Sequence, residues 1–138
     1  MELDLDIARK VLDAQPFSRL LDARITAFGD GVAVLEIDIR DQLRQQNGFV
    51  HGGVLAYAAD NTLTFAAGTV AGANLVTAGF TIDYVKPAVG TTLRARAEVV
   101  RAGRTRVICR CDIFTLDADG GETLCAVAQG AIAVASGG

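Results

Sequence analysis

The stretch GGVLAYAADNTLTFAAGTVAG, residues 52–72, is the most informative part of the 138-residue chain. Its residues are mostly apolar and small, and Asp60 is the only charged one. An apolar segment of this length predicts one long helix, from about residue 52 to about residue 70, with Gly72 ending it. A helix that is apolar on every side must be covered on most of its surface, so we expect the rest of the chain to wrap around it.

This apolar stretch is also long enough to raise the question of a membrane span. Asp60 and Asn61 lie near its middle, Gly and Ala are frequent, and strand-like segments follow it. These features favour a buried helix of a soluble protein, and we expect no membrane partner.

Alternating and helical patterns on either side of this stretch predict the remaining elements. Apolar residues at helical spacing predict a helix over residues 4–14, which Pro16 ends, and a short helical turn over residues 17–21. Six further segments have the alternation of strands, around a polar loop at residues 41–51: 23–28, 32–39, 75–86, 91–101, 104–116 and 122–134. We therefore predict an α+β fold, in which one antiparallel sheet of five to six strands wraps around the central helix. We expect residues 1–138 to form a single domain, with residues 1–20 as a helical extension.

The turn near Gly103 has two readings that differ in strand register. A two-residue loop would place arginines opposite cysteines and so mix polar with apolar faces. A three-residue loop over residues 101–103, with Gly103 left-handed, would pair Glu98 with Arg106 and keep the outer face polar. We predict the three-residue loop.

Composition and charge exclude several classes of function. The chain is 51% hydrophobic and 21% charged, which is typical of a globular protein. Its net charge of −3 argues against nonspecific nucleic-acid binding, which needs a basic face. The N-terminal residues MELDLDIARKVLD are too charged for a secretory signal, and three cysteines is an odd number for a disulfide-stabilised protein. We therefore expect a cytoplasmic protein.

Metal binding is not expected, because one histidine and the pair Cys109 and Cys111 supply too few ligands. The two cysteines alternate with polar residues on a predicted strand, so their side chains should face the central helix. We interpret them as core cysteines.

The start of the predicted long helix has the features of an acyl-transfer site. His51, the single histidine, stands directly before Gly52 and Gly53. A helix start leaves free backbone N–H groups that can bind a carbonyl oxygen or an anion. A lone carboxylate on an apolar helix, Asp60, is costly to bury and calls for an explanation. A tightly packed helix start and a satisfied buried acid would explain each feature singly, but not their combination.

The run NGFVHGGV, residues 47–54, together with Asp60 resembles the signature of hotdog-fold acyl-CoA thioesterases of the phenylacetate-degradation (PaaI-like) group. Residues 80–88, FTIDYVKPA, and the hairpin at residues 101–104 resemble the same family. The resemblance extends over residues 20–134. It implies a hotdog fold and hydrolysis of an acyl-CoA thioester.

The resemblance also implies roles for individual residues. The backbone N–H of Gly52 would polarise the thioester carbonyl at the helix N-terminus. Asp60 would act across a dimer interface, either as a nucleophile or as a base on a water molecule. His51 would orient the loop and the thioester, and a helix-capping role is the alternative. Gln45 stands six residues before the histidine, where the family usually has Asn, and keeps the amide that could order the water or the thioester.

A second group of residues is assigned to substrate binding. Thr77 matches a hydroxyl that the family places near the acid, although an ordinary strand threonine is an equal alternative. Asn47 and Gly53 belong to the loop and helix start that would hold the thioester. Lys86, Arg101 and Arg104 stand at loop ends and are candidates to bind the phosphates of coenzyme A, although a solvated surface role is usual for such residues.

These inferences lead to one expected function and two alternatives. The expected function is hydrolysis of an aromatic or short- to medium-chain acyl-CoA by a dimer or dimer of dimers with its active sites at the subunit interface. No cofactor is expected, because coenzyme A is part of the substrate. The alternatives are a non-catalytic acyl-CoA-binding hotdog domain and a hotdog enoyl-CoA hydratase or dehydratase.

Overall fold

The long central helix, α3, spans Gly52–Ala71, so the predicted helix is confirmed to within one residue at its end. The computed structural model describes residues 3–135. Gly72 follows α3 with a φ of 85°, a left-handed conformation that glycine adopts without strain. In the described part of the chain, no helix meets the length and hydropathy that crossing a membrane requires.

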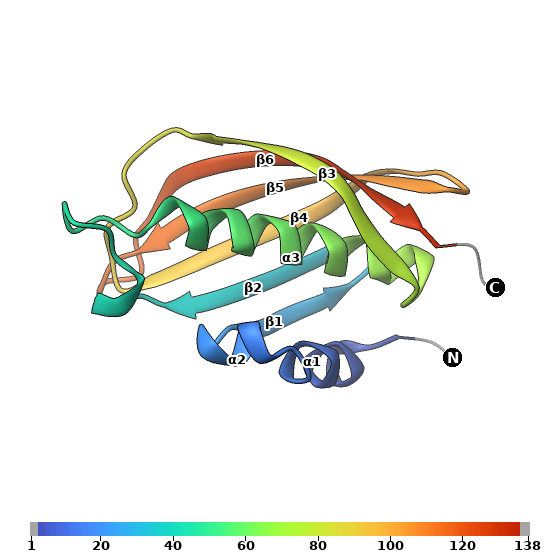
Figure 1. The fold of residues 1–138 in the computed structure, drawn as a ribbon, viewed down its shortest axis with the longest axis horizontal. Helices are drawn as coiled ribbons and strands as arrows, with labels where there is room; N and C mark the ends of the chain where they lie inside the picture. The colour runs from blue at the N-terminus through green and yellow to red at the C-terminus, as the bar shows by residue number, and fades with distance from the viewer. Residues whose placement is uncertain (1–2, 136–138) are drawn as a thin grey trace.

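Six antiparallel strands form one sheet that curves around α3 (Figure 1). Their order across the sheet is β1-β2-β4-β5-β6-β3. The strands are β1 (Arg24–Gly29), β2 (Val32–Asp38), β3 (Leu75–Tyr84), β4 (Thr92–Ala102), β5 (Arg106–Leu116) and β6 (Glu122–Val134). The predicted α+β hotdog architecture is confirmed. The sheet has six strands, the larger of the two numbers expected.

Two short helices precede the sheet: α1 (Leu5–Asp13) and α2 (Pro16–Leu20). Asp4 caps α1 by accepting a hydrogen bond from the Ile7 N–H, 2.9 Å away. Pro16 is the first residue of α2, where its missing N–H costs nothing. Both helices lie beside β1, the first edge of the sheet (Figure 1).

The two edges of the sheet differ in how they are covered. Arg9 of α1 donates from Nε to the carbonyl oxygen of Ile25 on β1, 3.2 Å away, so α1 covers that edge. β3 forms the other edge, and its side chains are half-buried or exposed along its whole length. An uncovered edge strand presents backbone groups that can pair with another chain.

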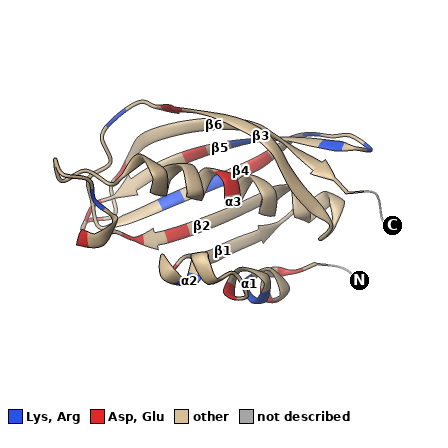
Figure 2. Ribbon diagram, in the orientation of Figure 1, with Lys and Arg blue, Asp and Glu red and all other residues tan. Residues whose placement is uncertain are grey.

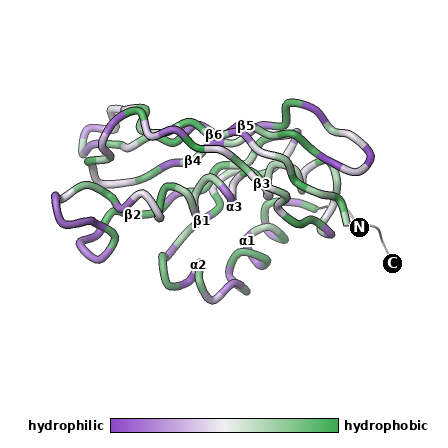
Figure 3. Tube along the Cα trace, turned by 45° about the horizontal axis from the view of Figure 1, so that its top comes forward, coloured by the Kyte–Doolittle hydropathy of each residue, from purple (hydrophilic) through white to green (hydrophobic). Residues whose placement is uncertain are grey.

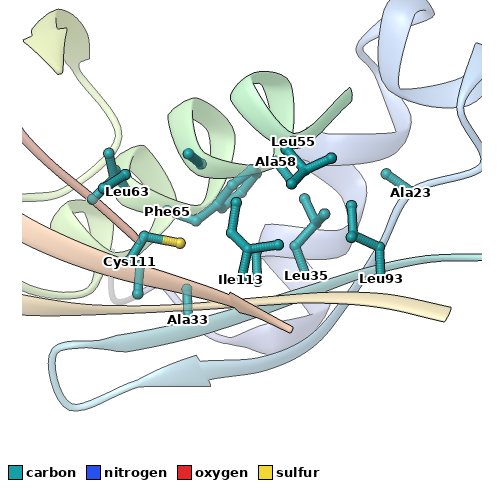
Figure 4. Packing of buried hydrophobic residues seen from close by; sticks show 14 of the residues in the cluster. Ala23, Ala33, Leu35, Leu55, Ala58, Leu63, Phe65, Leu93, Cys111 and Ile113 are labelled. Carbon is teal, nitrogen blue, oxygen red and sulfur yellow. The ribbon is translucent and has the colours of Figure 1, made fainter. Parts of the chain in front are cut away.

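The core lies between α3 and the concave face of the sheet (Figure 4). Leu55 and Leu63 on α3 pack among strand residues such as Leu35, Leu93 and Ile113. Four alanines on α3 are fully buried and leave room for close approach of the strands: Ala58, Ala59, Ala66 and Ala67. Hydrophilic residues concentrate in the loops at the two ends of the sheet (Figure 3).

The predicted register of the β4–β5 hairpin is wrong. Glu98 pairs with Arg110 and not with Arg106. The turn residues are Arg104 and Thr105, because the Gly103 N–H donates to the Arg106 carbonyl oxygen at 2.8 Å. Gly103 therefore ends the ladder and is not one of the residues with positive φ.

The error has a simple physical reason. The turn lies at residues 104 and 105, farther along the chain than predicted, and an extra residue, Val100, forms a bulge where the register of β4 shifts. Together these two differences move the partner of Glu98 by four residues. Four is an even number, and an even slip leaves every side chain on the same face of the sheet. Arg106 and Arg110 therefore do lie on the outer face as expected, although Glu98 has a different partner.

All three cysteines are free and fully buried, so the prediction of core cysteines is confirmed for Cys109 and Cys111. Burial raises the pKa of Cys109 to about 11 and, helped by the nearby Asp112 carboxylate, that of Cys111 to about 12. The third, Cys125, lies in β6 beside Thr115. Only the thiolate is nucleophilic, so these thiols should be inert in the folded protein.

We predict that Ellman's reagent labels the folded protein very slowly at pH 8 and labels all three cysteines after unfolding in guanidinium chloride. A raised pKa keeps a thiol protonated until the pH approaches that value, so the labelling rate of the native protein should rise as the pH is increased toward 11. Absorbance of the released thiolate measures both rates. Rapid labelling of Cys109 or Cys111 at pH 8 in the native state would contradict this packing.

Candidate active site

His51 caps the start of α3. Its Nδ1 accepts a hydrogen bond from the Gly53 N–H, 2.8 Å away. An accepting Nδ1 carries no proton, so the proton of the neutral ring is on Nε2. The capping role left open for His51 is therefore present in the structure, and the N–H of Gly53 is already bonded.

Gly52 presents the free donor at this helix start. The Val54 N–H donates to the His51 carbonyl oxygen at 2.9 Å, whereas the Gly52 N–H meets no acceptor among residues 3–135. Gly52 is the first residue of α3, where the aligned peptide dipoles concentrate partial positive charge. This N–H can therefore bind a carbonyl oxygen or an oxyanion.

A hollow of about 330 Å³ opens over Gly52. The sequence-predicted residues Gln45 and Lys86 line it together with Gly52, so the structure brings these three together. The other lining residues come mainly from the ends of the neighbouring loops: Phe49, Val50, Leu55, Tyr84, Val85, Pro87 and Ala88. Asn47 is exposed beside the hollow, and its backbone N–H donates to Gln45 Oε1.

Tyr84 is a residue of this site to which the sequence analysis assigned no role. Its hydroxyl donates to the carbonyl oxygen of Gly52 at 2.9 Å. A Cβ at position 52 would lie 3.3 Å from the Tyr84 ring, which is a tight contact, so the ring packs closely against this part of the backbone. The segment FTIDYVKPA, which carries part of the family resemblance, was the available signal.

Asp60 lies farther along α3 and is half-buried. It is the single acidic residue of an otherwise uncharged helix (Figure 2). The Thr77 hydroxyl on β3 donates to Asp60 Oδ1 at 2.7 Å, so the hydroxyl sought near the acid is in contact with it. The other oxygen, Oδ2, accepts no hydrogen bond from any residue that the structure describes.

A second hydroxyl supports this arrangement from one turn along α3. Thr64 Oγ1 lies 3.0 Å from Thr77 Oγ1 and 3.0 Å from the Asp60 carbonyl oxygen. Thr77 uses its one hydroxyl proton on the carboxylate, and Thr64 has one proton for two acceptors, the Asp60 carbonyl oxygen and Thr77 Oγ1. The Asp60 side chain is thus held at one oxygen and left open at the other.

A half-buried polar network lies beside Asp60. Ser18 of α2 donates to Gln15 Oε1 at 2.6 Å and lies 2.6 Å from the Tyr57 hydroxyl, to which Asn61 Nδ2 also donates at 3.0 Å. Burial raises the pKa of Tyr57, although its hydrogen bonds to Ser18 and Asn61 oppose the shift. The network fastens α2 to α3 at the position next to Asp60, and no pattern in the sequence indicated it.

The predicted cationic residues do not form one cluster within the chain. Lys86 lines the hollow over Gly52, and its backbone N–H donates to the Cys125 carbonyl oxygen. Arg101 and Arg104 lie on the β4–β5 hairpin at the opposite end of the sheet (Figure 2). No group of three or more potential metal ligands occurs in the part of the chain that the structure describes.

Comparison with known proteins identifies the family. The model of the thioesterase superfamily matches residues 47–122. A protein of Saccharolobus solfataricus that carries a provisional esterase name is 31% identical over 108 residues, which are 78% of this chain and 76% of that protein.

Solved structures agree with this assignment. A thioesterase family protein from Silicibacter pomeroyi has a TM-score of 0.86 and 28% identity, with 91% of this chain and 93% of that chain covered. The PaaI protein of the E. coli phenylacetic acid degradation operon shares the fold, with a TM-score of 0.82, 22% identity, and 94% and 91% of the two chains covered. The chain belongs to the thioesterase superfamily and is a thioester hydrolase.

Proposed function

We propose that this protein hydrolyses the thioester of an aromatic or short- to medium-chain acyl-CoA, with the Gly52 N–H and the Asp60 carboxylate as its two working groups. The observation that carries the proposal is the free N–H at the first residue of α3. A second support is the half-buried carboxylate on the same helix with one open oxygen. The three free cysteines favour the cytoplasm as the compartment.

The chemistry follows from where charge develops. When the carbonyl carbon of the thioester is attacked, its oxygen becomes negative, and the Gly52 N–H together with the helix dipole stabilises that charge. Asp60 either takes a proton from the attacking water or attacks the carbonyl itself to form an anhydride that water then hydrolyses. In both routes the C–S bond breaks, and coenzyme A leaves as a thiolate that takes up a proton.

Other residues have supporting roles in this proposal. Thr77 holds one oxygen of Asp60, which leaves the other oxygen available for the reaction. His51 fixes the start of α3 through its bond to Gly53, and Gln45 lines the hollow where the thioester would lie. Lys86 lines the same hollow and is the nearest candidate for a phosphate of coenzyme A.

The two working groups must come from different subunits. Eight residues of helix separate Asp60 from Gly52, which at 1.5 Å per residue is about 12 Å. Reacting atoms need to approach to within about 3.5 Å, so one copy of α3 cannot supply both groups to one thioester.

A second copy of the chain can supply the missing group through the uncovered edge of the sheet. β3 is ten residues long, and Val76 on it is 62% exposed. We propose a homodimer, or a dimer of dimers, in which this edge forms the subunit contact. In such an assembly Arg101 and Arg104 would reach coenzyme A from another subunit.

Replacing the acid should abolish most of the activity. Asp60→Asn preserves the size of the side chain and the hydrogen bond from Thr77 but removes the negative charge, so kcat should fall at least about 100-fold. The measurement is release of free thiol from phenylacetyl-, benzoyl- and straight-chain acyl-CoAs. Asp119→Asn, in the exposed β5–β6 loop, is the matched control and should retain wild-type rates. Full activity of Asp60→Asn, or no thiol released by the wild type from any substrate, would refute the proposal.

The donor can be removed without changing the rest of the helix. Gly52→Pro deletes the N–H at the first helical position, where proline is tolerated, whereas Gly52→Ala adds the same Cβ and keeps the N–H. Both variants add the Cβ that would lie 3.3 Å from the Tyr84 ring, so the difference between them reports the loss of the donor and not the added Cβ. We expect kcat for Gly52→Pro to be lower than that for Gly52→Ala by about 100-fold.

Mixing two inactive variants tests the shared site. A heterodimer of Asp60→Asn with Gly52→Pro contains one intact site if the donor and the acid come from different subunits. Random pairing of co-expressed chains should then restore about a quarter of the wild-type activity. If both groups came from one subunit, no mixture would recover activity, and a monomer in light scattering would also contradict the model.

A further inference from the structure

A second cavity, of about 190 Å³, lies between α1, the C-terminal half of α3 and the start of β3. Its walls are mostly apolar: Ile7 and Val11 from α1, Phe65 and Gly68 from α3, Phe28 from β1 and Leu75 from β3. It is separate from the hollow over Gly52, with which it shares no lining residue. Among the residues of the Asp60 region, Asn61 and Thr64 line it.

The polar end of this cavity leads to the proposed catalytic acid. Asn61 directly follows Asp60 in the chain. The Thr64 hydroxyl lies 3.0 Å from Thr77 Oγ1, which in turn donates to Asp60 Oδ1 at 2.7 Å. If the carbonyl carbon of the thioester reacts at Asp60, the acyl group bonded to that carbon lies next to the apolar cavity. The acyl group would enter the cavity past the side chains of Asn61 and Thr64.

Gly68 has no packing reason to be a glycine. It lies inside α3 with helical geometry, where glycine is less favourable than alanine. A Cβ built at this position would meet its nearest neighbours, Leu75 and Phe28, at 3.9 Å, which is an ordinary contact distance. Alanine would therefore fit and would favour the helix. What glycine preserves here is open volume, because the position lines the cavity.

The size of the cavity limits what can fill it. An engineered apolar cavity of roughly 150 Å³ in another protein stays dry and binds benzene. The cavity here is somewhat larger, at about 190 Å³, and α1 forms one wall of it. A phenyl ring fits this space.

We propose that this cavity holds the acyl group of the substrate, that it accepts a group about the size of a phenyl ring, and that Gly68 keeps it open. The inference rests on the proposed thioesterase site, because it places the acyl group beside Asp60. It adds the location of the acyl group, the elements that bound it, and the residue that determines selectivity.

Filling the cavity tests the proposal through a selectivity ratio. The quantity is kcat/KM for phenylacetyl-CoA divided by kcat/KM for acetyl-CoA, whose acyl group is too small to need the cavity. Gly68→Leu should lower this ratio at least tenfold, Gly68→Ala should lower it less, and Ile7→Ala, which enlarges the cavity, should shift the preference toward larger acyl groups. Val70→Leu is the matched control, because Val70 is on the same helix, is 49% exposed and does not line the cavity. An equal loss for both substrates in Gly68→Leu would overturn the proposal.

A binding measurement separates failure of this proposal from failure of the thioesterase assignment. The probe is a non-hydrolysable phenacyl thioether of coenzyme A, and its affinity is compared with that of coenzyme A alone. The acyl cavity is supported if the probe binds more tightly than coenzyme A alone, and if Gly68→Leu abolishes this difference whereas Val70→Leu preserves it. This conclusion holds even if no substrate is hydrolysed. A probe affinity that Gly68→Leu leaves unchanged would overturn the cavity assignment, even if the wild type is an active thioesterase. Thermal unfolding of Gly68→Ala, expected at or above the wild-type temperature, verifies that the variant folds.

Discussion

The burial of α3 is the constraint on which the rest of the structure depends. A 20-residue helix with almost no polar face cannot be covered by one partner, so a six-stranded sheet must curve around it. The small residues on the helix allow that approach, since Ala58, Ala59, Ala66 and Ala67 are fully buried. The length and curvature of the sheet thus follow from the need to remove one helix from water.

This burial also explains why the proposed chemistry is distributed as it is. The start of α3 lies at the end of the sheet, where the free N–H of Gly52 opens into a hollow. Asp60 lies near the middle of the helix, where the neighbouring β3 supplies the Thr77 hydroxyl. Since one rigid helix holds both groups about 12 Å apart, the proposed reaction calls for a second copy of the chain. The uncovered edge of β3 is where that copy can be added.

Sequence reasoning was most accurate where a single periodicity decides the outcome. The limits of α3 and the six strands agree with prediction to within about two residues, because apolar alternation depends on which face is buried. The register of the β4–β5 hairpin was wrong because a slip by an even number of residues preserves both faces, and the bulge at Val100 left no mark in the pattern. Tyr84 and the Ser18–Tyr57–Asn61 network escaped notice because their partners are far away in the sequence.

The sequence by itself determined the central helix, the wrapped antiparallel sheet, and the presence of a helix-start glycine and a lone carboxylate on the same helix. These features are local or periodic, so residue order alone carries them. Only the tertiary structure decided that the N–H of Gly53 is bonded to His51 while that of Gly52 is free, and that Arg101 and Arg104 lie far from Lys86. It also revealed the cavity beside Asp60, which α1, α3, β1 and β3 enclose together. Hydrogen-bond partners and empty volume depend on the positions of several elements at once, and no single segment of the chain encodes them.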